Sequence, residues 1–157
     1  MPPAPAPEGL PDWEDVRAAA IGDSSTRRTD LAVDVRPCDA ESPDPSARST
    51  AYRRFWMQPK GKLPDDPLIH AALLVFASDR MLLRVAARPH GSVWKVRDAA
   101  SVDHAFWLHH RARFDDWMLY VCESPMAEAG RALAFGAIYT RDGKRVASVA
   151  QEGIVRF

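Results

Sequence analysis

The feature that most constrains the fold is the segment 68–85, LIHAALLVFASDRMLLRV, which is apolar on nearly every side of a helix. Asp66 precedes it as a candidate N-cap, and Pro67 suits the first helical position, where its missing N–H costs nothing. Pro89 and Gly91 signal the end of the helix. Since a helix without a polar face is buried on most sides, we expect this one at the centre of the molecule.

Strand patterns account for most of the remaining chain. The predicted strands are 31–36, 52–57, 99–111, 117–124, 131–140 and 145–157. Asp142-Gly143 predicts a type I′ turn between the last two strands. Consecutive strands with short turns imply an antiparallel sheet, and a strongly curved sheet can enclose a helix. The sequence therefore predicts an α+β fold, with a long central helix wrapped by a curved antiparallel β-sheet.

The first 30 residues are expected to form a linker-like, partly mobile segment before a single domain over 31–157. Residues 1–12 are rich in Pro and Ala, and a short amphipathic helix is predicted from Trp13 to Ile21. The start has neither the basic nor the apolar region of a signal peptide, and no apolar run approaches the roughly 20 residues that span a bilayer. We therefore expect a soluble, cytoplasmic protein that does not enter a membrane.

Composition argues against several classes of partner and cofactor. Lys plus Arg and Asp plus Glu both number 21, which gives no electrostatic basis for binding nucleic acid or an anionic membrane. Cys38 and Cys122 lack metal-site spacing and are expected to be free thiols. There is no Gly-rich phosphate loop and no GxSxG nucleophile motif. The sequence thus predicts no cofactor, no metal and no serine-hydrolase triad.

Three polar residues stand in apolar or strand contexts. Asp79 lies inside the apolar helix, and Gln151 shares a strand face with Val149 and Val155. Ser101 lies near the start of the third strand. Each has a structural explanation: Asp79 can face solvent near the helix end, Gln151 can bond to backbone, and Ser101 can serve a turn. Together they can also form one cluster that holds and activates a water.

His104 is a candidate metal ligand or general base by residue type. Strict alternation along the third strand places it on the face opposite Ser101 and Asp103. With His109 and His110 it makes no recognised ligand geometry, and a packed or solvated neutral histidine is the expected state.

From Leu63 onward the sequence resembles the acyl-CoA thioesterase II family. The segments that carry the resemblance are LPDDPLIHAALLVFASD, ARPHG, ASVDHAFWLHHR, WMLYVCESPMA and YTRDGKRVASVAQEGIVR, and the opening PPAPAPEGLPDW is similar to the linker before the family's second domain. The family joins two hotdog domains in one polypeptide and hydrolyses acyl-CoA to free fatty acid and coenzyme A. The resemblance implies a hotdog fold and, as catalytic residues, Asp79, Ser101 (where the family has Thr) and Gln151.

The resemblance covers only the family's second domain, which leaves alternatives open. It implies pairing with a copy of the chain, as a homodimer, or with a separate hotdog chain, since the two domains of the family pack together. A non-catalytic subunit that pairs with a first-domain chain, or that binds acyl ligands without cleaving them, is the rival to the hydrolase. Hydration or dehydration of an acyl thioester is a third possibility.

Overall fold

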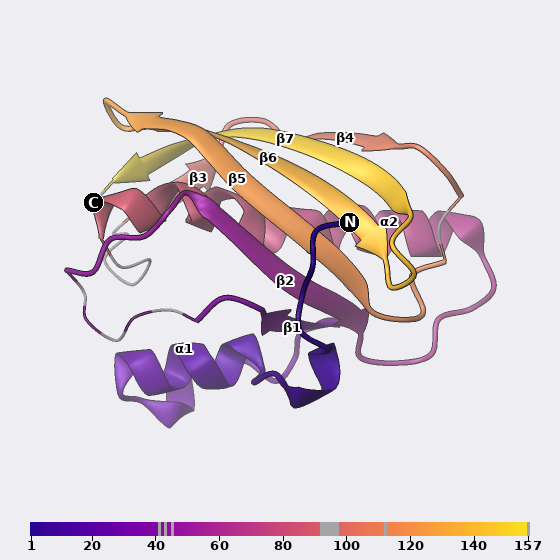
Figure 1. Ribbon diagram of the computed structural model, residues 1–157. Helices are drawn as coiled ribbons and strands as arrows, with labels where there is room; N and C mark the ends of the chain where they lie inside the picture. Colours follow the sequence, from indigo (N-terminus) through magenta and orange to yellow (C-terminus); the bar gives the residue numbers. More distant parts are fainter. Residues whose placement is uncertain (41, 43, 45, 92–97, 112, 157) are drawn as a thin grey trace.

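The computed structural model describes residues 1–40, 42, 44, 46–91, 98–111 and 113–156. Its main elements, in chain order (Figure 1), are α1 (Trp13–Ile21), β1 (Val33–Pro37), β2 (Tyr52–Pro59), α2 (Pro67–Leu82), the 3-10 helix η3 (Leu83–His90), β3 (Asp98–Ser101), β4 (Ala105–Leu108), β5 (Met118–Glu128), β6 (Arg131–Thr140) and β7 (Arg145–Arg156).

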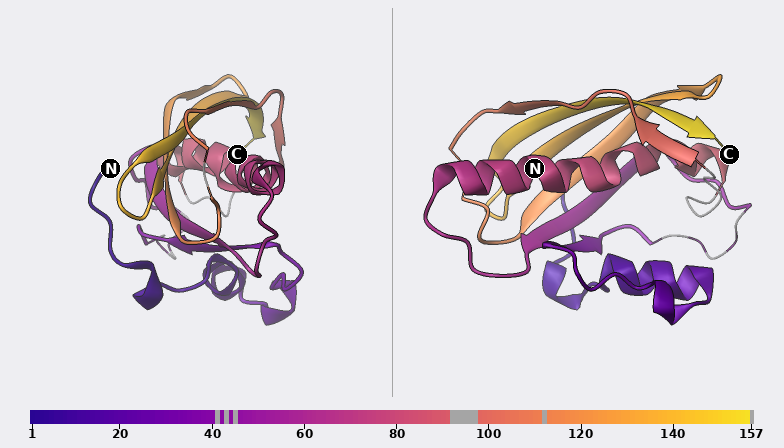
Figure 2. Two further views of the ribbon diagram at one scale, coloured as in Figure 1. Left: turned by 90° about the vertical axis from the view of Figure 1, so that its right-hand side faces the viewer. Right: turned by 180° about the vertical axis from the view of Figure 1, so that it is seen from behind.

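The described strands form one antiparallel sheet that curls around α2. The strand order is β1-β2-β5-β6-β7-β3, and β4 also pairs with β7 beyond the end of β3. Viewed along the axis of α2, in the left panel of Figure 2, the strands curve around the helix. This arrangement confirms the predicted hotdog fold.

Helix α2 begins as the sequence predicts. Asp66 is the N-cap, its side chain accepts the Leu68 N–H, and Pro67 occupies the first turn. The helix is 16 residues long. Within the described part of the chain, no helix is both long and apolar enough to cross a membrane.

The expectation that α2 is buried on most sides is wrong. One face packs into the core through His70, Leu74, Ala77, Ser78, Met81 and Leu82. The opposite face is open to solvent: Leu68 is 74% exposed and Phe76 is 52% exposed. The sheet encloses only one side of the helix, so an apolar stripe remains on the molecular surface.

A tyrosine fixes the buried face of α2 to the sheet. The hydroxyl of Tyr120 on β5 donates to the Ser78 carbonyl at 3.0 Å. The ring fits because its neighbour on β6 is Gly136, where an added Cβ would lie 2.4 Å from Tyr120 Cε2. The end of α2 that carries Asp79 is therefore held at a defined height above β5 and β6.

The predicted strand 99–111 is in fact two strands, separated by a one-residue bulge. Ser101 pairs with Gly153, whereas Ala105 pairs with Ala150, so three residues of one strand oppose two of β7. The bulge is stabilised locally, because the Asp103 carboxylate accepts the Glu152 N–H at 2.7 Å. A bulge reverses the inward and outward alternation of side chains beyond it.

The hairpin between β6 and β7 forms as predicted, but its turn type differs. Gly143 has a φ of 96°, while Ala129 is the only described residue other than glycine with positive φ. Asp142 therefore does not adopt the conformation that a type I′ turn requires. Gly143 N–H donates to the Thr140 carbonyl at 2.9 Å, as in a type I turn followed by a glycine bulge. At the far end of β7, Phe157 lies outside the described residues.

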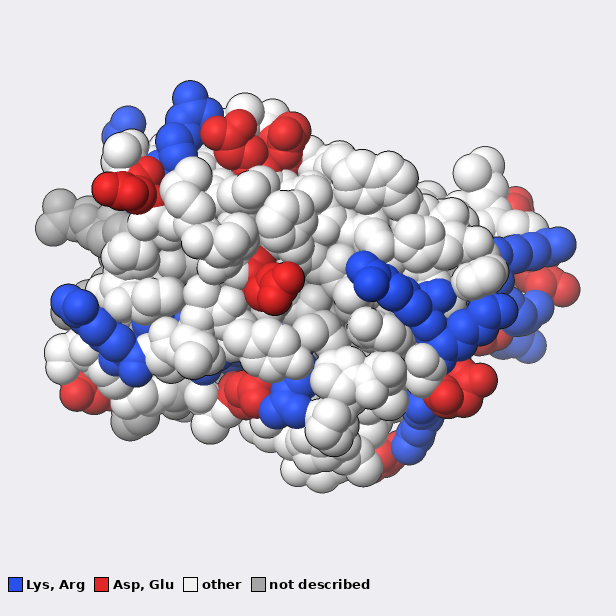
Figure 3. All heavy atoms as spheres, turned by 45° about the horizontal axis from the view of Figure 1, so that its top comes forward, with Lys and Arg blue, Asp and Glu red and all other residues white. Residues whose placement is uncertain are grey.

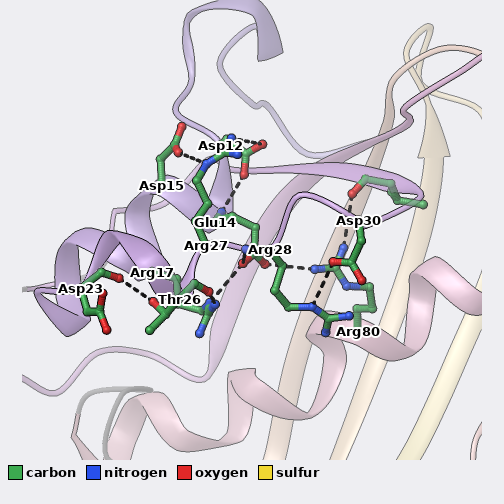
Figure 4. Close-up of polar contacts among 11 residues, drawn as sticks. Asp12, Glu14, Asp15, Arg17, Asp23, Thr26, Arg27, Arg28, Asp30 and Arg80 are labelled. Atoms are coloured by element: carbon green, nitrogen blue, oxygen red, sulfur yellow. Dashed lines mark hydrogen bonds and ion pairs between the residues drawn. The ribbon is translucent and has the colours of Figure 1, made fainter.

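The N-terminal segment packs against the β1–β2 edge of the sheet. Helix α1 has the predicted bounds, and its Trp13 is only 2% exposed. Trp13 meets the Phe55 ring edge-on, with the centroids 6.4 Å apart. The side chain of Glu14 reaches Arg17 and Arg80, which connects α1 to α2 (Figure 4). The division into a segment 1–30 and a domain 31–157 remains a prediction.

Charges of both signs share the molecular surface. On the face seen in Figure 3, Lys, Arg, Asp and Glu gather toward the two ends, and mostly uncharged side chains lie between them. Neither sign forms a continuous field over this face.

Candidate active site

Three side chains from α2, β3 and β7 meet at the C-terminal end of α2. The amide Nε2 of Gln151 donates to Asp79 Oδ1 at 2.6 Å and also to Ser101 Oγ. Ser101 Oγ in turn donates to Asp79 Oδ1 at 3.3 Å. The three predicted site residues therefore form a closed triangle of hydrogen bonds, and their catalytic role remains a prediction.

The local structure explains why these side chains converge. Asp79 continues the exposed stripe of α2 that begins at Leu68, about one turn after Val75 and Phe76. Ser101 is the last residue of β3, immediately before the bulge. Gln151 lies on β7 opposite the bulge and is fully buried. The irregular pairing of β3 and β4 with β7 is thus located at the cluster itself.

The hydrogen bonds leave one oxygen of Asp79 available. Both donors reach Oδ1, and within the described residues Oδ2 accepts no hydrogen bond. The Asp79 side chain is 52% exposed, so Oδ2 is accessible to water. Gln151 donates both of its amide hydrogens within the cluster, to Asp79 and to Ser101. A carboxylate held by one oxygen and open at the other is suited to accept a proton from a bound water.

His104 is a neighbour of the cluster that the sequence interpretation missed. Its Nε2 lies 2.9 Å from Ser78 Oγ, and that hydroxyl already donates its proton to the Val75 carbonyl. Nε2 must therefore carry the hydrogen of this contact. Nδ1, which is buried, lies 3.7 Å from Asp79 Oδ1.

The bulge explains why the prediction for His104 failed. Strict alternation put His104 on the face opposite Ser101, but the extra residue turns both side chains toward α2. The aspartate at Asp103, in the middle of a strand pattern, was the available signal. Across the described residues, no group of three or more His, Cys, Asp or Glu is arranged to hold a metal ion.

Two hollows flank the cluster, and Asp79 and Ser101 line both of them. One, of about 330 Å³, is lined in addition by Arg80, Leu83, Arg84, Ala99 and Val155. The other, of about 410 Å³, is lined in addition by Val75, Phe76, Val102, Asp103 and His104. The cluster therefore lies between a hollow that contains two arginines and a mainly apolar one.

The chain matches known proteins along almost its whole length. A family model described as acyl-CoA thioesterase matches residues 24–154. Acyl-coenzyme A thioesterase 8 of Mus musculus is 30% identical over 99% of this chain and 52% of its own length. Acyl-CoA thioesterase 2 of Haemophilus influenzae is 33% identical over 79% of this chain and 44% of its own length. The chain spans about half the length of these relatives.

Solved structures agree in fold. An acyl-CoA thioesterase II, TesB2, from Mycobacterium marinum superposes with a TM-score of 0.74 at 34% identity, covering 100% of this chain and 56% of that one. A hotdog-fold protein from Alicyclobacillus acidocaldarius has a TM-score of 0.70 at 18% identity, covering 100% of this chain and 55% of the other, and supports the fold alone. By the match of the family model and of these relatives, the chain belongs to the acyl-CoA thioesterase family.

Proposed function

We propose that this chain hydrolyses acyl-CoA thioesters to free fatty acid and coenzyme A, using a water activated by Asp79, Ser101 and Gln151. The observation that carries the proposal is the orientation of Asp79, whose Oδ1 accepts two hydrogen bonds while Oδ2 is open. Membership of the acyl-CoA thioesterase family supports the choice of substrate.

In the proposed reaction Asp79 is the general base. Oδ2 takes a proton from water as the water oxygen bonds to the thioester carbonyl carbon. When the resulting intermediate collapses, the carbon–sulfur bond breaks and the proton on Asp79 passes to the leaving thiolate, which regenerates the carboxylate. Gln151 and Ser101 hold Oδ1, so that the carboxylate keeps one orientation through both steps.

The apolar stripe on α2 supports pairing with another hotdog chain. Leu68 and Phe76 on α2, with Trp107 on β4, are large apolar side chains that face solvent in the isolated chain. Monomeric proteins rarely leave such groups together on the surface. A homodimer, or a complex with a separate hotdog chain, would cover them. The stripe also supports the alternative function, a non-catalytic subunit of such a pair.

A steady-state assay with acyl-CoAs of several chain lengths, run at an oligomeric state measured by sedimentation, tests the proposal. The variant Asp79→Asn keeps the shape of the side chain but cannot accept the proton, so we expect kcat to fall about 100-fold or more. Asp65→Asn is the matched control, because Asp65 is 80% exposed at the other end of α2. Normal turnover by Asp79→Asn, or none by the wild-type chain, would refute the hydrolase and favour the pairing module.

A further inference from the structure

The hollow beside Asp79 and Ser101 that contains Arg80 and Arg84 has an unusual charge balance. Arg80 Nη2 lies 3.3 Å from a carboxylate oxygen of Glu14. Arg84 makes neither a hydrogen bond nor an ion pair with any described residue, and its guanidinium carbon lies 6.0 Å from the centroid of the Trp13 ring. A partly buried cation without an anion is costly, which makes Arg84 a candidate for contact with a ligand.

The surroundings of Arg84 add to its positive potential. Burial lowers the pKa of Arg84, and the nearby charges of Arg17 and Arg80 lower it further, while Glu14 opposes them. Glu14 already bonds to Arg17 through Oε2 at 3.2 Å and to Arg80 through Oε1, as Figure 4 shows. Both carboxylate oxygens of Glu14 are thus engaged by other arginines. The hollow retains an excess of positive charge at its Arg84 end.

The two hollows on either side of the cluster differ in polarity, as the acyl chain and the phosphate-bearing part of an acyl-CoA do. The hollow on the side of Val75 and Phe76 is mainly apolar and suits an acyl chain. The hollow on the side of Arg80 and Arg84 is basic and suits phosphate, which arginine binds through paired N–H donors. The thioester then falls between them, at Asp79 and Ser101.

The spacing of Asp79 and Arg84 along the chain agrees with placing the phosphates of the substrate at the Arg84 end of the hollow. Arg84 follows Asp79 by five residues, three steps in α2 and two in the 3-10 helix η3, which together rise roughly 8.5 Å, and its side chain extends the reach. Coenzyme A carries its phosphates at the far end of the neutral pantetheine arm. The arm would therefore pass along the hollow, and the phosphates would meet Arg84 at the end away from the reacting carbon.

We infer that the hollow lined by Arg80 and Arg84 binds the phosphate-bearing part of coenzyme A, with Arg84 as its specific phosphate contact. The inference rests on the proposed function for the identity of the ligand. It goes further in assigning the direction of the substrate and a specificity-determining residue.

Calorimetric titration of the full chain with coenzyme A and with pantetheine, which lacks the phosphates, tests the site without requiring turnover. We expect Arg84→Gln to weaken coenzyme A binding about tenfold and to leave pantetheine binding unchanged, because only coenzyme A carries phosphates that Arg84 can contact. Arg84→Lys should recover part of the affinity. Arg113→Gln, which removes the same charge from an exposed ion-paired site, should bind coenzyme A normally.

Kinetics separate this inference from the proposed function. With acyl-CoA, Arg84→Gln should raise KM about tenfold at constant kcat, whereas acyl-pantetheine should be hydrolysed as by the wild type. If the wild-type chain hydrolyses neither substrate, the proposed hydrolase activity is refuted. The titrations still test the phosphate site in that case. Equal losses for both ligands, no loss for either, or binding of inorganic pyrophosphate as tight as that of coenzyme A would overturn the site.

Discussion

Gln151 Nε2 on β7 lies 2.6 Å from Asp79 Oδ1 on α2, although 72 residues separate the two in sequence. The contact depends on the curvature of the sheet, which brings the middle of β7 over the C-terminal end of α2. It also depends on the bulge opposite Gln151, which turns Ser101 and His104 toward the same helix.

The hydroxyl of Ser101 should matter more than the identity of the residue. Ser101→Ala removes both the donor to Asp79 and the acceptor for Gln151, so we expect kcat to fall about tenfold. Ser101→Thr keeps the hydroxyl and should retain activity to within about threefold. Steady-state rates on one acyl-CoA measure both variants. A fully active Ser101→Ala would exclude the hydroxyl from the mechanism.

His104 should act as a positioning residue for Asp79, because its imidazole lies beside the carboxylate, with Nδ1 3.7 Å from Oδ1. His104→Gln retains a donor for Ser78 but removes the imidazole beside Asp79, and His104→Ala removes both. We expect each variant to lower kcat about tenfold and to change the pH profile of kcat, with KM little altered.

The control for His104 is His109→Gln, because His109 is exposed and contacts Ser148 instead of the cluster. A purely structural role would give a different pattern. In that case His104→Gln would behave as the wild type, and the loss in His104→Ala would follow its lower stability.

Glu14 should stabilise the attachment of α1 to α2. Its carboxylate is 5% exposed and bonds to Arg17 and Arg80, so Glu14→Gln would leave two partly buried cations without their anion. We expect the free energy of unfolding in urea to fall by about 2 kcal/mol. Glu8→Gln, at an exposed pair with Arg141, should leave the unfolding midpoint in urea nearly unchanged.

The same unfolding curves test the domain boundary predicted at residue 30. If residues 1–30 belong to the cooperative unit, Glu14→Gln shifts one common transition. A separate early transition for Glu14→Gln, with the main midpoint unchanged, would indicate that the segment detaches on its own.

The two thiols should be unreactive in the folded protein. Burial, followed by the negative charge of Asp39, raises the pKa of Cys38 to about 11. The thiolate is the reactive form, and only about 0.1% of Cys38 is thiolate at pH 8, so alkylation should be slow there and its rate should rise about tenfold per pH unit until pH approaches that pKa. Alkylation by iodoacetamide, followed by mass spectrometry, measures this.

Cys122 provides the internal comparison. It is fully buried, and burial raises the pKa of its thiol. We expect its alkylation only in denaturing urea, where both cysteines should react at the rate of a free thiol. Rapid labelling of either residue at pH 8 without urea would contradict the packing around it.

Elements whose signals are local could be predicted from the residues alone. Helix α1 and strand β6 have the predicted bounds, and the Asp66 cap with Pro67 begins α2, because caps, turns and side-chain periodicity act over a few residues. The resemblance to a family supplied Asp79, Ser101 and Gln151 as a group. Nothing in their spacing along the chain required that they meet.

Features that depend on register and curvature became apparent only in the folded chain. The Asp103 carboxylate stabilises the bulge by accepting the Glu152 N–H, a contact that forms only once β7 has paired with β3 and β4. The bulge reverses the orientation predicted for His104. The exposed stripe of α2 follows from how far the sheet curls around the helix. Among the described residues Arg84 lacks an anion, because Glu14, from a distant segment, is engaged elsewhere. Such long-range contacts leave no periodic pattern in the sequence, because they depend on which distant segments the folded chain brings together.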